Sequence, residues 1–205
     1  MPELQAARGA SLTTNEVPDP SVGATSGPHS GGPARRSARA TTGVAFAVAT
    51  VALLVDILTK HFAVRELTGR EPVEVLGEFL QLRLVRNPGA AFSAGASLTP
   101  FISVVAVVAA CVVAFYAFRV RHRGWAVAVG LLLAGVTGNL VDRLFRAPGP
   151  FRGHVVDFFA LPNWPVFNVA DICIDVAAGL MVLFLLRGSR LDGEPHQHDA
   201  RRDDT

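Results

Sequence analysis

Four long apolar segments constrain the fold of this chain more than any other feature. They cover approximately residues 42–60, 98–118, 124–142 and 166–186 of the 205-residue sequence. A helix of roughly 20 apolar residues crosses the hydrocarbon of a bilayer, and a helix in lipid satisfies its own backbone hydrogen bonds. The residues are 50% hydrophobic and 18% charged, which is too apolar for an ordinary soluble domain of this size. We therefore expect an all-α membrane protein with four transmembrane helices.

The segments on either side of this membrane domain, which we place at residues 41–187, are polar. Residues 1–40 are rich in Gly, Pro and Ser and contain almost no large apolar side chains, which predicts a disordered N-terminal tail. They lack the basic start and immediate apolar core of a cleavable signal peptide, so the first apolar segment should remain as an anchor. Residues 188–205 form a second polar tail.

Four spans place both termini on the same side of the membrane. The lysines and arginines that flank the spans number eight on each side, so their count does not orient the protein. The short link between the second and third spans contains Arg119, Arg121 and Arg123, and short basic loops favour the cytoplasmic side. We therefore expect both termini, including the polar tail 188–205, in the cytoplasm.

The loop between the first two spans, residues 61–97, has a pattern of its own. In "EVLGEFLQLRLV", Leu80, Leu82 and Leu84 alternate with polar residues, which is the period of a half-buried strand, and Gly77 is a plausible turn. The pattern predicts a small β-sheet cradle on the outer face of the membrane.

Two spans carry polar residues at the ends that face this loop. Asn139, Asp142 and Arg143 have the spacing i, i+3 and i+4, so they share one face of the third span. Asn168 and Asp171 repeat the Asn-x-x-Asp spacing at the start of the fourth span. Charged residues inside a span suggest a functional site by default. The two faces should meet at the same depth.

Asp157 lies in the connection between these two spans, which must return its carboxylate towards the same ends. Two close carboxylates share one proton, so one acts as an acid while the other acts as a base on water. Such a pair suits hydrolysis of an amide, and the helix dipole favours Asp171 as the ionised partner. Spacing alone also allows Asp171 and Asp175, one turn deeper, to be the pair.

Other polar residues have structural interpretations. Asp142, Arg143 and Asn139 could equally form a structural knot at a helix end, and Asp56 is expected to be a helix-end or interhelix hydrogen-bonding group. His154 is more typical of an interfacial side chain than of a metal ligand, and we expect no metal.

The cysteines and the net charge limit which metals and partners the chain is expected to bind. Cys111 and Cys173 lie in apolar runs without metal-ligand spacing and are expected to be packing residues. The net charge of +2 comes without a basic stripe, so nucleic acid is not an expected partner.

Five motifs occur in order through about residues 45–186. They are "VDILTK", "RNPGAAFS" with Asn87 and Phe92, "GVTGNLVDR", "GHVVDFF" and "FNVADICI". In this order they resemble the motifs of the lipoprotein signal peptidases, also called signal peptidase II, the aspartic membrane proteases that mature bacterial prolipoproteins. Two departures stand out: Ala134 replaces the first of paired glycines, and Asp175 occupies a position that is usually uncharged or small.

The resemblance implies a function and a site. Asp157 and Asp171 would be the catalytic pair, and the residues that orient the substrate or the aspartates would be Asn87, Asn139, Asp142, Arg143 and Asn168. The substrate would be a diacylglyceryl-modified prolipoprotein in the bacterial cytoplasmic membrane, cut just before its lipidated cysteine, without metal or cofactor. It also implies cytoplasmic termini and a site near the outer face. We expect a monomer.

Two other functions remain open from the residues alone. A small transporter or proton-relay protein would use acids distributed through the membrane. In that hypothesis the relay would be formed by Asp56, Asp142, Asp171 and Asp175. A structural membrane subunit would use the same residues as a polar knot between helices. Most of these acids gather at one face, with only Asp175 clearly deeper, which is not the distribution that a relay predicts. A structural knot gives no reason for Asp157 in a loop, so the peptidase is the leading hypothesis.

Overall fold

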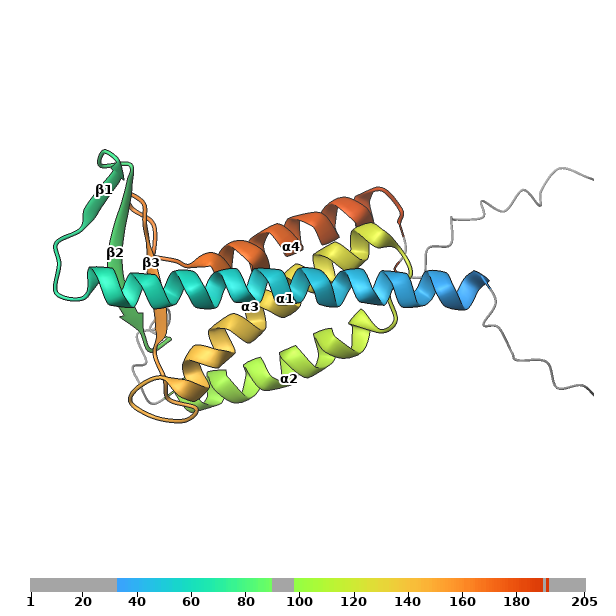
Figure 1. The fold of residues 1–205 in the computed structure, drawn as a ribbon, viewed down its shortest axis with the longest axis horizontal. Helices are drawn as coiled ribbons and strands as arrows, with labels where there is room; N and C mark the ends of the chain where they lie inside the picture. The colour runs from blue at the N-terminus through green and yellow to red at the C-terminus, as the bar shows by residue number, and fades with distance from the viewer. Residues whose placement is uncertain (1–32, 90–97, 190, 192–205) are drawn as a thin grey trace, which may run out of the picture. The chain divides into compact units, whose positions relative to one another are not determined.

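The computed structural model describes residues 33–89, 98–189 and 191. Along these residues the elements are α1 (Pro33–Leu67), β1 (Val73–Leu76), β2 (Leu80–Asn87), α2 (Thr99–Ala117), α3 (Arg123–Phe145), β3 (Val155–Ala160) and α4 (Val169–Leu186) (Figure 1). Four helices and one small sheet confirm the predicted fold class.

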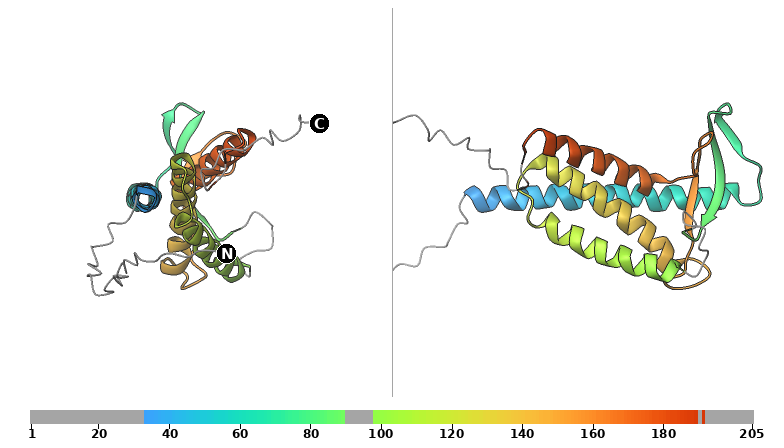
Figure 2. Two further views of the ribbon diagram at one scale, coloured as in Figure 1. Left: turned by 90° about the vertical axis from the view of Figure 1, so that its right-hand side faces the viewer. Right: turned by 180° about the vertical axis from the view of Figure 1, so that it is seen from behind.

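Each of the four helices is long and apolar enough to cross a membrane. α3 is the central helix, because 50% of its apolar span is buried against 22% or less of each of the others, and it packs against α1, α2 and α4. Figures 1 and 2 show the sheet at one end of the four helices, where α1 ends and α4 begins. We call this the sheet end.

α1 differs most from its predicted bounds. It begins at Pro33, inside the stretch 1–40 predicted as a tail, and ends at Leu67 rather than near residue 60. Residues 34–40 are mostly Ala and Arg, which are strong helix formers, and Pro is favoured in a first helical turn. The other three helices lie within three residues of their predicted bounds. The tail residues 1–32 and 192–205 lie outside the described part of the chain.

The strands form one antiparallel sheet in the order β1-β2-β3. The turn between β1 and β2 contains Gly77 with φ +53°, a left-handed conformation that favours glycine, as the sequence pattern predicted. Between β2 and β3, Asn87 pairs with Val155 and Val85 pairs with Asp157. Asn87 and Asp157 are therefore diagonal neighbours on one face of the sheet.

The sheet is fixed to the helices by an apolar cluster. Val156 and Phe158 of β3 are buried against Ala63 and Leu67 in the last turns of α1. Because side chains alternate along a strand, this packing turns Asp157 to the opposite face of β3. That face is turned towards the start of α4 and the end of α3. The extension of α1 beyond residue 60 is what supplies this support.

Candidate active site

Asp157 is buried in the middle of β3, with 2% of its surface exposed. Its Oδ2 accepts a hydrogen bond from Nδ2 of Asn87 at 3.0 Å, across the β2–β3 pair. Its Oδ1 accepts from Nδ2 of Asn168 at 2.6 Å. Both carboxylate oxygens are thus held by side-chain amides from a neighbouring strand and a helix start.

Asp171 lies in the first turn of α4, where it closes a capping box with the N-cap residue Asn168. The backbone N–H of Asp171 donates to Oδ1 of Asn168 at 3.1 Å, and the backbone N–H of Asn168 donates to Oδ2 of Asp171 at 3.1 Å. Oδ1 of Asp171 accepts from Nδ2 of Asn139 on α3 at 2.8 Å. The helix N-terminus favours a negative charge at this carboxylate.

Three carboxamides therefore surround the two carboxylates, and we call them the carboxamide layer: Asn87, Asn139 and Asn168. The amide oxygen of each of these residues accepts a hydrogen bond from a group other than the two aspartate side chains. The oxygen of Asn87 accepts from the backbone N–H of Gly89 at 2.8 Å, that of Asn139 accepts from Nζ of Lys60 at 3.0 Å, and that of Asn168 is held by the capping box. Because an amide has one acceptor and one donor end, all three NH₂ groups face the aspartates.

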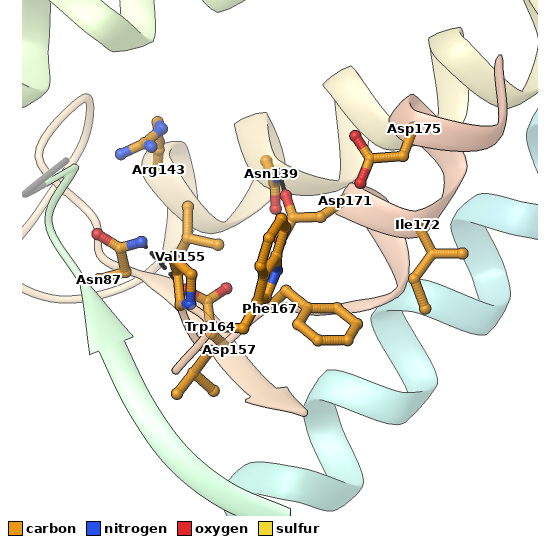
Figure 3. A pocket seen from close by; sticks show the side chains of 12 residues that line it. Asn87, Asn139, Arg143, Val155, Asp157, Trp164, Phe167, Asp171, Ile172 and Asp175 are labelled. Atoms are coloured by element: carbon orange, nitrogen blue, oxygen red, sulfur yellow. Dashed lines mark hydrogen bonds between the residues drawn. The ribbon is translucent and has the colours of Figure 1, made fainter. Parts of the chain in front are cut away.

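The two carboxylates open onto one pocket of about 340 Å³ (Figure 3). Its polar lining comes from Asn87, Asn139, Arg143, Asp157, Asp171 and Asp175. Its apolar lining comes from Val155, Trp164, Pro165, Val166, Phe167 and Ile172. The connection from β3 to α4 thus covers the carboxylates with aromatic and aliphatic side chains.

The buried position of Asp157 changes its titration. Burial, together with a smaller effect of the nearby Asp171 carboxylate, raises the pKa of this carboxyl from its ordinary value of 3.8 to about 6. The hydrogen bonds from Asn87 and Asn168 oppose this rise, as does the positive charge of Lys60. Asp157 can therefore hold a proton at a pH where an exposed aspartate has lost it.

Arg143 of α3 lines the same pocket. Its Nη1 is buried and has no hydrogen-bond partner among the described residues. A buried guanidinium donor without a partner is costly, so this nitrogen is suited to a carbonyl or carboxylate oxygen of a ligand.

Asp142 does not share this environment, although it is one residue away in sequence. Its Oδ2 lies 3.1 Å from Nζ of Lys60 and accepts the backbone N–H of Val156 at 3.1 Å, and its Oδ1 pairs with Nε of Arg146. Among the described residues its charged partners are Lys60 and Arg146, whereas Arg143 lines the pocket. Asp142 supports the site indirectly by holding β3 beside Asp157.

Asp56 makes an interhelix contact, as the sequence suggested. Its Oδ1 accepts the backbone N–H of Ala170 in the first turn of α4 at 2.9 Å, and its Oδ2 pairs with Nζ of Lys60 at 2.9 Å. We call the charged cluster of Asp56, Lys60, Asp142 and Arg146 the buried knot. Sequence reasoning missed Lys60 as a site residue, although its i, i+4 spacing from Asp56 on an apolar helix was a usable signal.

Asp175 lies one turn from Asp171 on α4 and lines the wall of the pocket. Its side chain is exposed, and none of the hydrogen bonds found among the described residues of the site joins it to Asn139 or Asn168. The geometry therefore favours the pair of Asp157 and Asp171, which share Asn168, over the pair of Asp171 and Asp175. Phe92, which the motif singled out, lies outside the described residues.

These features define a class of protein: a multi-pass membrane protein with two amide-held carboxylates in a pocket at one end of its helices. Residues 48–187 match the family model of signal peptidase II. The chain is 47% identical to a lipoprotein signal peptidase of Rhodococcus jostii over 148 residues, which cover 72% of this chain and 75% of that protein. It is 42% identical to one of Streptomyces coelicolor, with 80% and 81% of the two chains covered.

A solved structure of a bacterial membrane enzyme has the same fold. The two superpose with a TM-score of 0.64 at 25% identity, over 72% of this chain and 95% of that one. The chain belongs to the signal peptidase II family, and it is therefore a protease of bacterial membranes. This membership favours a peptidase over a transporter or a structural subunit.

Proposed function

We propose that the protein is an aspartic endopeptidase in which Asp157 and Asp171 are the catalytic pair. The observation that carries this proposal is the carboxamide layer. It binds both carboxylates with neutral N–H donors, and no ion pair to either aspartate occurs among the described residues. Without a cation in contact, the pair can exchange a single proton rather than remain fixed as two anions.

The reaction follows from the two environments. Protonated Asp157 gives its proton to the oxygen of the scissile carbonyl, while ionised Asp171 removes a proton from a water molecule as that water attacks the carbonyl carbon. The tetrahedral intermediate collapses when Asp171 passes its proton to the leaving nitrogen and the C–N bond breaks. The proton that Asp157 gave to the carbonyl oxygen returns to it as the new carboxyl group forms.

The substrate we propose is a diacylglyceryl-modified prolipoprotein, cut just before its lipidated cysteine. Relatives that match most of this chain are lipoprotein signal peptidases. The pocket lies at the sheet end of four apolar helices, and Trp164 and Ile172 on its rim are exposed, so a lipid-anchored peptide can approach from the bilayer. We place this end at the outer face and both termini in the cytoplasm.

Cleavage of a lipidated prolipoprotein peptide by purified protein in detergent tests this proposal. Asp157→Asn and Asp171→Asn should each lower kcat by about 10³-fold or more, because each removes one partner of the proton transfer. Glu66→Gln, an exposed carboxylate change on α1, is the matched control and should keep parental turnover.

Full turnover in either aspartate variant would show that the pair is misassigned. Cleavage of the unlipidated peptide as fast as the lipidated one would contradict the proposed substrate. Asp175→Asn separates the two pairs that spacing allowed, since a loss equal to that of Asp157→Asn would place Asp175 in the catalytic pair.

A further inference from the structure

Lys60 is the member of the buried knot that donates a hydrogen bond to the carboxamide layer, at Asn139. It lies on α1 with 1% of its side chain exposed. Its Nζ is 2.9 Å from Asp56, 3.1 Å from Asp142 and 3.0 Å from Oδ1 of Asn139. The contact with Asn139 is a hydrogen bond, and those with Asp56 and Asp142 are ion pairs.

Asn139 depends on this contact in a way that the other two carboxamides do not. Asn87 and Asn168 each have their oxygen bound by a backbone N–H, which the fold itself holds in place. The oxygen of Asn139 accepts from Lys60 at 3.0 Å and from Nδ2 of Asn168 at 3.2 Å. Of these two, Lys60 is the charged donor, and charge-assisted hydrogen bonds are the stronger kind.

We propose that Lys60 is a positioning residue for the reaction: its ammonium fixes the carboxamide of Asn139 so that the NH₂ group faces Asp171. The inference rests on the proposed catalytic pair. If Lys60 is lost, the oxygen of Asn139 keeps only the hydrogen bond from Nδ2 of Asn168, so the carboxamide is held less firmly and can turn. Asp171 would then lose the N–H donor that orients its carboxylate, so it would act less well as the base.

The charge of Lys60 has a second effect on the pair. It opposes the raised pKa of Asp157, so removal of the charge should raise that pKa further above about 6. The other charged groups around this carboxyl are Arg143 on α3 and Asp171 on α4, with Asp175 on the wall of the same pocket, while β2 presents the neutral Asn87. All of them are retained when Lys60 alone changes.

A charge-balanced variant isolates this role. Lys60→Met alone would leave two buried carboxylates without their shared cation, so it is combined with Asp56→Asn, whose amide oxygen can still accept from the N–H of Ala170. We expect this double variant to melt near the parent temperature in detergent, with kcat lowered about tenfold or more, KM changed less than about threefold, and the alkaline limb of the pH profile moved upward. Asp56→Asn alone is the control and should keep parental kcat.

Two further variants separate positioning from structural support. Lys60→Gln with Asp56→Asn restores a neutral donor to Asn139, so kcat should recover while the pH limb stays shifted. This variant also carries the test if the Met variant does not fold. In an Asn139→Ala background, the Met double substitution should cause no further loss of kcat, because Lys60 acts through Asn139.

Parental kcat with a parental pH profile in the Met variant would overturn the inference, as would fully additive losses in the Asn139→Ala background. Either result could occur while Asp157→Asn and Asp171→Asn remain inactive. Failure of the Lys60 inference is therefore distinguishable from failure of the proposed function.

Discussion

The buried knot and the carboxamide layer lie one helical turn apart on α3, yet they treat their carboxylates in opposite ways. In the knot, Asp56 and Asp142 contact the cations Lys60 and Arg146, so two negative charges meet two positive ones. In the layer, Asp157 and Asp171 contact neutral amides. The role of a buried acid in this protein therefore depends on whether its hydrogen-bonding or ion-pair partner is a cation or a neutral amide.

The physical reason is the effect of each partner on the proton. A cation in contact attracts an ionised carboxylate, so the acids of the knot join helices through ion pairs. An amide N–H stabilises the ionised form less, and burial then keeps the protonated form within reach, as the raised pKa of Asp157 shows. The knot is therefore suited to holding α1, α3 and α4 together, and the layer is suited to acid–base chemistry.

The largest effect on stability should come from breaking the knot at Asp142. Asp142→Ala leaves Lys60 and Arg146 without one of their anions and removes the acceptor for the buried N–H of Val156. The expected loss is about 3–5 kcal/mol of unfolding free energy, measured by thermal or denaturant unfolding in detergent.

Asp142→Asn provides the graded control for this prediction. It keeps one acceptor and loses the charge, so its stability should lie between that of the parent and that of Asp142→Ala. Equal stability of all three proteins would show that the knot does not hold the helices together.

A smaller effect should come from the close packing of the helices at the knot. A Cβ on Gly138 of α3 would collide with the carboxylate of Asp56 and lie 3.3 Å from the Cβ of Ala170. Asp56 is held by its own contacts, so Gly138→Ala should destabilise the protein by about 1–3 kcal/mol.

Gly179→Ala on α4 is the matched control, because a Cβ there meets nothing within 4 Å. It should be neutral or slightly stabilising, since alanine is the better helix former. The two variants are compared by melting temperature in the same detergent. If they melt together, the close approach of α3 to Asp56 has no energetic role.

Much of the fold could be predicted from the sequence because bilayer thickness and strand alternation leave direct patterns. Segment length and hydropathy predicted four helices, and alternating leucines with Gly77 predicted the β1–β2 hairpin. The extent of α1 was not predictable in this way. The charges of Asp56 and Lys60 predicted that the first span ends near them. In the structure these two residues pair with each other inside the bundle, and the helix continues to Leu67.

Contacts in the site could be predicted where helical spacing determines which residues meet. They could not be predicted where the direction of a side chain determines its partner. The repeated Asn-x-x-Asp spacing places Asn139 and Asp171 at one depth, and they meet at 2.8 Å. Spacing does not say whether Asp142 turns to Arg143 or to Arg146, because both lie within one turn of it. Nor does it reveal that Lys60, 79 residues before Asn139, binds that carboxamide.

The central claim is that Asp157 is an acid whose proton is available near neutral pH, and a titration of its carboxyl carbon tests it most directly. Protein labelled with carbon-13 at the aspartate carboxyl groups is titrated in detergent, and Asp157→Asn identifies the signal. We predict a midpoint near pH 6, and a kcat/KM that falls as the pH rises and Asp157 loses its proton. A midpoint at the ordinary value of 3.8 would contradict it.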